Sequence, residues 1–115
     1  MSNNPSTIAR GNVINHWVLA ITLSPTSVAP NTSLEQTFSV TGLHLGDYVD
    51  VNKPTTQAGL GLNGCRVSAK DTLAINFMND TAATITPTAS EVYTVAILRP
   101  ENLTPAGVAA LSAAN

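Results

Sequence analysis

Apolar and polar residues alternate with a period of two through much of the chain between Trp17 and Leu98. The alternation is clear at Leu73, Ile75 and Phe77, where every second residue is a large apolar one. Successive side chains of a strand point to opposite faces of a sheet, so this period indicates strands that bury one face. No long stripe with the 3.6-residue period of a helix appears in the same range. The pattern therefore predicts an all-β domain.

Turn-forming residues divide this range into about seven short strands at the spacing typical of a sandwich or jelly roll. We expect strands at 17–23, 34–41, 47–51, 65–69, 73–77, 83–86 and 91–98, with a glycine-rich loop at 55–64. Lys70-Asp71 and Asn79-Asp80 are expected to be tight turns. The fold class predicted is an antiparallel β-sandwich, jelly-roll-like, in residues 17–100.

The two ends differ from this domain. Residues 1–16 are polar and carry apolar side chains only at Ile8, Val13 and Ile14 after the initial Met, so we expect an extended arm that binds a neighbouring subunit or a shell. In the tail, residues 101–115, Thr104 could cap a short helix with Pro105 at its first position. A helix and a loose arm remain equally open there.

The composition of the chain argues against nucleic acid and membranes as binding partners. Charged residues make up 10% of the chain, against about 25% in an average domain, and the five Lys and Arg residues are scattered, which argues against nucleic acid. The first sixteen residues lack a signal peptide, and the apolar run 17–23 is too short to cross a membrane. We therefore expect a soluble protein that is made in the cytoplasm of a cell and has no membrane partner.

Few residues offer chemistry. Residues 59–64 match the G-x-G-x-x-G dinucleotide motif, but a β-alternating segment follows them where that motif needs a helix, so a plain loop is favoured. The two histidines, His16 and His44, have no metal-ligand spacing. Asp47 and Asp50 are three residues apart and are expected on opposite faces of a strand, with Asp47 capping a turn. An enzyme would need a pocket that gathers His16 or His44 with Asp47 or Asp50. We predict no catalytic, cofactor or metal site.

Other residues have simple structural interpretations. Cys65 has no partner for an intrachain disulfide and is expected to be a small apolar filler. Trp17, Tyr48 and Tyr93 could form a sugar-stacking platform, although core or interface packing is favoured for each. Three glycosylation-type triplets are most simply turn residues: Asn31-Thr-Ser33, Asn79-Asp-Thr81 and Asn102-Leu-Thr104.

The last expected strand is apolar on both faces. Tyr93, Val95 and Ile97 oppose Val92, Ala96 and Leu98, so the strand is either buried on both sides or covered by a neighbouring subunit. Since a lone small sandwich cannot cover both faces, we predict a homo-oligomer and expect a trimer. Its interface, or the contact with a shell, is expected at the following residues: Ile8, Val13, Ile14, Tyr93, Val95 and Ile97.

Three segments carry a resemblance to a known class of proteins. Gly46-Asp-Tyr-Val-Asp-Val-Asn-Lys-Pro54, Arg66-Val-Ser-Ala-Lys-Asp-Thr-Leu-Ala-Ile75 and Asn79-Asp-Thr-Ala-Ala-Thr-Ile-Thr-Pro87, with the glycine-rich loop, resemble a cassette of small virion proteins of tailed bacteriophages. The resemblance spans about half of the chain and carries no catalytic residues. It implies a β-rich, commonly trimeric capsid decoration (cement) protein on the virion surface that binds the major capsid protein and stabilises the head. The alternative is a fibre or adhesin module that binds a host glycan or receptor.

Overall fold

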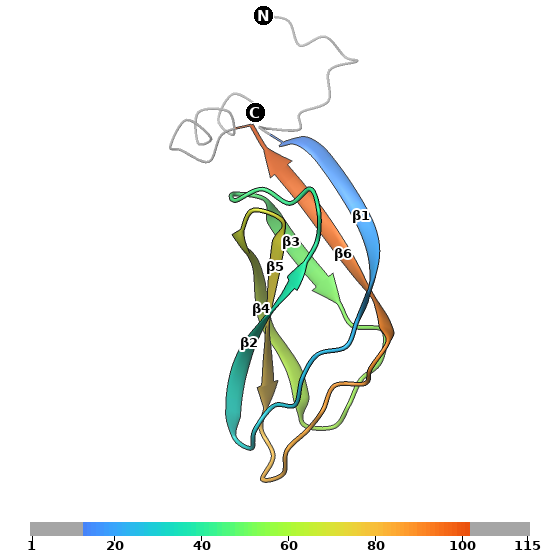
Figure 1. Cartoon of the computed structure of the whole chain (residues 1–115), viewed down its shortest axis with the longest axis vertical. Coiled ribbons are helices and arrows are strands. Elements are labelled where there is room, and N and C mark those ends of the chain that lie inside the picture. The colour runs from blue at the N-terminus through green and yellow to red at the C-terminus, as the bar shows by residue number, and fades with distance from the viewer. Residues whose placement is uncertain (1–12, 102–115) are drawn as a thin grey trace, which may run out of the picture.

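The computed structural model describes residues 13–101, which form six strands and contain no helix (Figure 1). The strands are β1 (Val13–Leu23), β2 (Thr32–Ser39), β3 (Tyr48–Asn52), β4 (Leu60–Ala69), β5 (Thr72–Asn79) and β6 (Glu91–Pro100). Every pairing between them is antiparallel. The all-β prediction is confirmed for this part of the chain.

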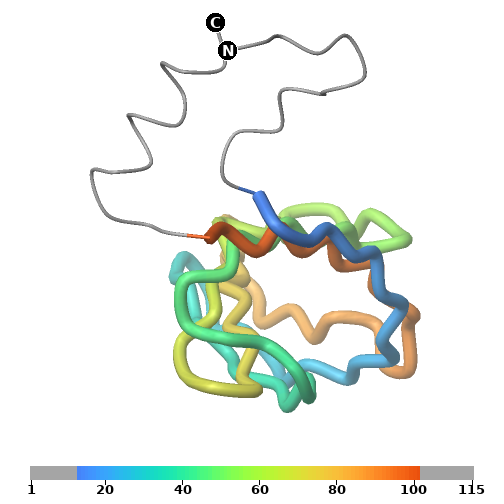
Figure 2. The backbone as a smooth tube through the Cα atoms, turned by 90° about the horizontal axis from the view of Figure 1, so that it is seen from above, coloured from blue at the N-terminus to red at the C-terminus, as the bar shows by residue number. Residues whose placement is uncertain are grey.

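The strands form two three-stranded sheets, with the orders β1-β6-β3 and β2-β5-β4. The sheets face each other across one hydrophobic core, in a sandwich-like arrangement that Figure 2 shows from one end. Val13 pairs with Pro100, so the described chain enters and leaves the sandwich at the same end. The other end is closed by the connections between strands.

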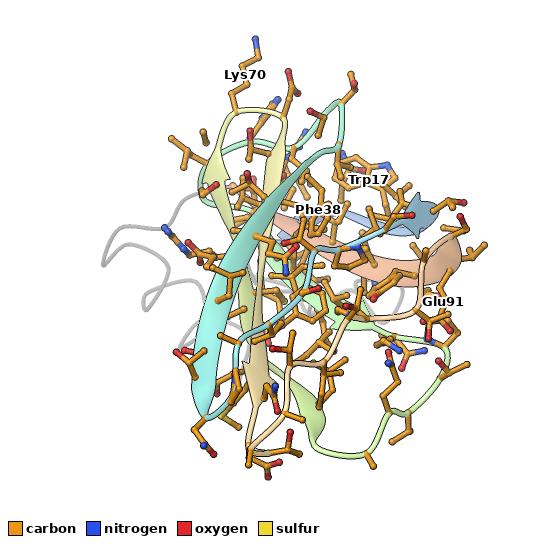
Figure 3. All side chains as sticks on the ribbon, turned by 60° about the horizontal axis from the view of Figure 1, so that its bottom comes forward. Trp17, Phe38, Lys70 and Glu91 are labelled. Carbon is orange, nitrogen blue, oxygen red and sulfur yellow. The ribbon has the colours of Figure 1, made fainter. Side chains whose placement is uncertain are left out.

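The predicted alternation places side chains correctly in most strands. Leu73, Ile75 and Phe77 of β5 are fully buried, and Val49 of β3 and Val67 of β4 join them in the core. The turn at Lys70-Asp71 is also confirmed: it joins β4 to β5, and Lys70 projects away from the molecule at its tip (Figure 3). These features depend on local sequence patterns, which explains why they could be predicted.

The prediction placed a subunit interface on one face of β6, and that face is the one buried in the core. Tyr93 and Val95 have no exposed surface and Ile97 is 3% exposed, because these three side chains point between the sheets. The opposite face of β6 reaches the surface, where Val92 is 51% exposed. Both faces are apolar, and only the position of the second sheet decides which of them is inside. These three residues are therefore core residues and do not form a subunit interface in this fold.

The domain boundaries also shift. β1 begins at Val13, so residues 13–16 belong to a strand of the domain and not to the expected arm. The strand expected at 83–86 is reduced to a single bridge between Val28 and Ile85. Ile8, the rest of the arm and the C-terminal segment with the possible helix lie outside the described residues.

The loop expected at residues 55–64 is only partly present: residues 55–59 form loop and turn, and residues 60–64 belong to β4. Leu60 opens β4, and both Leu60 and Leu62 pack half-buried against the core, which draws this segment into the sheet. The pairing with β5 is interrupted between Leu62 and Cys65, where Gly64 adopts a φ of 108° that favours glycine. The G-x-G-x-x-G match therefore begins in a turn at Gly59 and continues along β4, and a strand in the place of a helix does not suit a dinucleotide site.

Asn79 organises the connection between β5 and β6 from inside the protein. It is 1% exposed, and its side-chain Nδ2 donates to the carbonyl oxygens of Val28 (3.0 Å) and Ala83 (2.7 Å). Its Oδ1 accepts hydrogen bonds from the backbone N (2.9 Å) and Oγ1 (2.7 Å) of Thr81. The triplet that begins at Asn79 is thus a turn motif, as the sequence indicated.

Candidate functional site

A charged cluster lies at the end of the sandwich where the described chain enters and leaves. Arg99 of β6 donates two hydrogen bonds to Asp47, from Nε to Oδ1 (2.9 Å) and from Nη2 to Oδ2 (2.8 Å). Nη2 also donates to the carbonyl oxygen of Gly42 (2.8 Å), and the guanidinium carbon lies 4.8 Å from the centroid of the Trp17 ring. Arg99 therefore fixes the corner that precedes β3 to the ends of β1 and β6.

The electrostatics of this pair favour the charged forms of both groups. The hydrogen bonds from Arg99, and a smaller effect of the backbone N–H of His44, hold the pKa of Asp47 below its ordinary value despite partial burial. The same contact raises the pKa of Arg99. The Asp47 side chain is 2% exposed, and the Arg99 side chain 20%. Both groups are committed to each other, so this carboxylate is not free to act as a general base.

The predicted turn role of Asp47 is confirmed. Its Oδ2 accepts a hydrogen bond from the His44 backbone N (2.9 Å), and its own N–H donates to the His44 carbonyl oxygen (3.0 Å). Sequence reasoning missed Arg99 as its partner, because the two residues are far apart along the chain. The signal available was a single Arg in an otherwise apolar last strand.

A cavity of about 300 Å³ opens beside the cluster. It is lined by Trp17, Leu19, Thr41, Gly42, Leu43, Ile97 and Arg99. Its walls are mainly apolar, and its only charged group is the Arg99 guanidinium, which is already paired with Asp47. This arrangement supplies neither a nucleophile nor a proton-transfer group.

The residues considered for catalysis do not come together. His44 lies near Asp47 at the corner before β3, but His16 is an exposed residue of β1 and Asp50 is exposed on β3. Among residues 13–101, no group of three or more His, Cys, Asp or Glu is placed to hold a metal ion. Cys65 is half-buried and its Sγ lies 3.4 Å from the carbonyl oxygen of Val49. Burial raises the pKa of this thiol, as expected for a packing residue.

The outer face of the β1-β6-β3 sheet is the other notable surface, and we call it the outer apolar face. The strand register and the alternating burial place the following outward residues on it: His16, Val18, Ala20 and Thr22 of β1, Val92, Thr94, Ala96 and Leu98 of β6, and Tyr48, Asp50 and Asn52 of β3. Val18 is 64% exposed and Tyr48 65%. Asp50 is the one carboxylate on this face, and no Lys or Arg belongs to it.

The outer face of the other sheet has a different character. Arg66 of β4 and Glu35 of β2 form a two-point ion pair across β5 with contacts of 2.8 and 2.9 Å. Ala74 lies between their strands and is fully buried. The surrounding outward residues are mostly polar, although Met78 is 42% exposed. Only one of the two sheets therefore presents a charge-poor outer surface.

The three aromatic residues considered for sugar stacking are separated. Tyr93 is a core residue, Trp17 is half-buried beneath Arg99, and Tyr48 stands alone on the outer apolar face. Together they form no common platform. Each therefore has a packing or surface role of its own.

The chain matches no known protein family, no curated protein and no solved structure. No helix long and apolar enough to span a membrane occurs in residues 13–101.

Proposed function

We propose that this protein is a non-enzymatic structural component that binds the surface of a larger protein assembly, as a capsid decoration protein does. The observation that carries the proposal is the outer apolar face. Val18, Tyr48 and Val92 expose more than half of their side chains on a sheet that needs none of them for its own core. Exposed apolar surface of this kind commonly marks a protein–protein contact.

The absence of Lys and Arg from this face also favours a protein partner. Nucleic acid binding needs clustered Lys and Arg, and this face has neither. The cores of protein–protein interfaces are depleted in charged residues and enriched in Tyr and other large side chains. The expected partner is the major capsid protein, and the expected location is the virion surface, as the resemblance to small phage virion proteins implies.

Two finer parts of the fold prediction remain part of this proposal. A jelly roll has eight strands, whereas residues 13–101 contain six, so that classification needs further strands from the ends of the chain. The helix that the sequence allows from Pro105 onward concerns residues outside the described part of the chain, as does the loose arm that is its alternative. The sequence predicts a trimer because Tyr93, Val95 and Ile97 would need a neighbouring subunit to cover them. These residues are core residues, so they no longer support a trimer.

The first test is mass spectrometry of purified virions of the phage that encodes the chain. The proposal requires the protein in intact particles at a copy number that is a simple multiple of the capsid subunits. Its absence from particles would refute the proposal.

The second test uses particles assembled without the protein. Unmodified protein is expected to bind and saturate them, and Val92→Lys to bind at least tenfold more weakly, because a lysine on the central strand of this face must be desolvated on binding. Met78→Lys is the matched control, since Met78 has similar exposure (42%) on the opposite sheet. Equal loss of binding in both variants would show that the outer apolar face is not the contact.

A truncation of the N-terminal residues is the third test, and it uses the same particles. Because β1 begins at Val13, the informative truncation removes residues 2–12 and leaves the strand whole. If the arm fastens the subunit, the truncated protein still folds but fails to saturate the particles. If it binds as tightly as the full chain, attachment lies on the sandwich alone.

The alternative, an adhesin module, depends on Tyr48 as its one exposed aromatic among the described residues. A glycan array separates the two functions. Binding of the isolated protein to a defined glycan, lost in Tyr48→Ala, would support the adhesin and count against the decoration protein.

A further inference from the structure

Each sheet has two edge strands, and an edge strand presents unpaired backbone N–H and C=O groups that can pair with another chain. The edges are β1 and β3 in one sheet and β2 and β4 in the other. Natural proteins protect such edges by shortness, charge, proline, bulges or a covering segment. The four edges of this protein differ in how well they are protected.

Two edge strands are protected: β3 is short, and β4 pairs irregularly with β5. β3 has only five residues, includes Asp50 and is followed by Pro54, and Cys65 of β4 contacts its Val49 carbonyl oxygen. β4 is interrupted twice in its pairing with β5, between Leu62 and Cys65 and again after Val67. Neither strand offers a long regular edge.

The β2 edge is protected by charge and by a neighbouring loop. Glu35 lies in the middle of the strand. The Gln36 side chain holds the loop after β1 through two hydrogen bonds to the backbone of Thr26, at 2.7 Å to its N and 3.0 Å to its O. A new strand at this edge would meet both obstacles.

Within residues 13–101, the β1 edge has none of these features along its regular part, residues 15–23. From Asn15 to Leu23 it keeps an unbroken register with β6, and its one irregularity lies before Asn15. The strand has eleven residues, with no proline and no Asp, Glu, Lys or Arg. In an antiparallel ladder, alternate residues of β1 bond to β6, and the residues between them direct their backbone groups to the open edge.

The inward side chains of β1 are also incompletely covered. Trp17, Leu19 and Ile21 pack against the core but remain half-buried. In the adjacent strand of the same sheet, Tyr93 and Val95 are fully buried. The difference arises because β6 has a neighbour on both sides and β1 on only one. A further strand beside β1 would cover these side chains.

We propose that β1 pairs antiparallel with β1 of a second copy of this chain, which joins two sheets into one six-stranded sheet of order β3-β6-β1-β1-β6-β3. The absence of Asp, Glu, Lys and Arg from β1 makes a second copy of the chain a suitable partner. A two-fold axis places a strand against itself, so any charged residue near the axis faces a like charge, which is destabilising. β1 has no such residue, and the partner β1 has the same alternation of inward and outward side chains.

This dimer goes beyond the proposed function and does not depend on it. Pairing at the edge leaves the outer apolar face free and joins the two copies of it side by side, so a dimer can bind a shell with both subunits. Failure of shell binding would leave the dimer intact, and failure of the dimer would leave a monomer able to bind.

The test is sedimentation equilibrium of the full chain from 1 to 100 μM. The unmodified protein is expected to approach twice its monomer mass of 11.9 kDa. Val18→Lys is expected to weaken the dimer at least tenfold, because an edge lysine opposes pairing and both copies bring theirs close to the axis. A monomer throughout the range for the unmodified protein would overturn the proposal.

The matched control is Val92→Lys, which has the same new charge on the same face but lies on β6, one strand away from the edge. Edge pairing predicts that Val92→Lys stays dimeric. If both variants dissociate, the copies pack face to face and the proposal is wrong.

Hydrogen exchange of the unmodified protein decides the question even if Val18→Lys fails to fold. Amides of β1 are expected to exchange at least tenfold more slowly at 100 μM than at 1 μM, with amides of the β2 edge unchanged. Concentration-independent exchange in β1 of a dimeric protein would place the interface elsewhere and refute edge pairing.

Discussion

Arg99 and Asp47 are 52 residues apart in the sequence, yet the guanidinium of Arg99 holds both oxygens of the Asp47 carboxylate. The pair joins the last strand to the corner before β3. The same guanidinium lies over the Trp17 ring, so one side chain fixes three separate segments. This contact closes the end of the sandwich at which the chain enters and leaves.

The Asp47→Asn variant is expected to be less stable by about 2 kcal/mol, because it leaves the mostly buried Arg99 without its counter-charge. Urea unfolding at pH 7 measures the change. Glu35→Gln is the control, since the Glu35–Arg66 pair is exposed (38% and 63%) and its loss should have little effect. Equal effects of the two substitutions would show that burial does not distinguish these pairs.

The same pair predicts an acid-dependent loss of stability. The pKa of Asp47 is lowered from its ordinary value of 3.8 by the hydrogen bonds of Arg99. Its contribution is therefore complete above the unfolded pKa and is lost as the pH falls through the lower, folded pKa. Unfolding free energies measured from pH 5 to pH 2 should fall less steeply in Asp47→Asn than in the unmodified protein. Parallel curves would contradict this assignment.

Asn79→Ala is expected to cost about 3 kcal/mol, because it removes the four side-chain hydrogen bonds that anchor the loop after β5: two to the carbonyl oxygens of Val28 and Ala83, and two from Thr81. Asn79→Asp is the informative companion. It keeps the acceptor for Thr81 but replaces the Nδ2 donor, so it should be at least as destabilising as alanine. An aspartate variant close to the unmodified protein in urea unfolding would mean that the donor bonds contribute little.

Gly59 and Gly61 give a matched pair of substitutions two residues apart. Gly59 has a φ of 81°, and a Cβ there would clash with Thr81 Cγ2, so Gly59→Ala should destabilise by roughly 2 kcal/mol or more. At Gly61 a Cβ meets nothing within 4 Å, so Gly61→Ala should be neutral or stabilising by about 0.5 kcal/mol. Thermal unfolding of both variants checks the pair, and similar effects would contradict the close approach at Gly59.

Tyr93 has a buried hydroxyl with no hydrogen-bond partner in the described part of the chain. Tyr93→Phe is therefore expected to be neutral or to stabilise by about 1 kcal/mol. Burial, together with Glu91, raises the pKa of Tyr93 from 10.0 to about 12. The unfolded state then loses its proton first, so stability should fall as the pH rises from 10 to 12, and this fall should be smaller in Tyr93→Phe. A clearly destabilised Phe variant would indicate a partner for the hydroxyl.

Several elements follow from short-range patterns and were predictable from the sequence. The inward side chains of β5 follow from its period of two, the turn at Lys70-Asp71 from its residue types, and the cap at Asp47 from its position after Gly46. Each depends on neighbours only a few residues away. The all-β class follows from the repetition of such patterns along the chain.

Other features depend on which segments meet in space, and only the tertiary structure decided them. β6 is apolar on both faces, so its own sequence cannot tell that Tyr93 is inside and Val92 outside; the position of the second sheet decides it. Gly61 became part of a strand because its leucine neighbours reach the core. The arrangement of the strands brings Arg99 to Asp47, and within the described part of the chain it leaves residues 15–23 of β1 with a neighbouring strand on one side only. The sequence thus determined the kinds of element and their local faces, because strand period and turn chemistry are short-range properties. The packing of the two sheets determined the surface left for partners, because it depends on contacts between residues far apart in the chain.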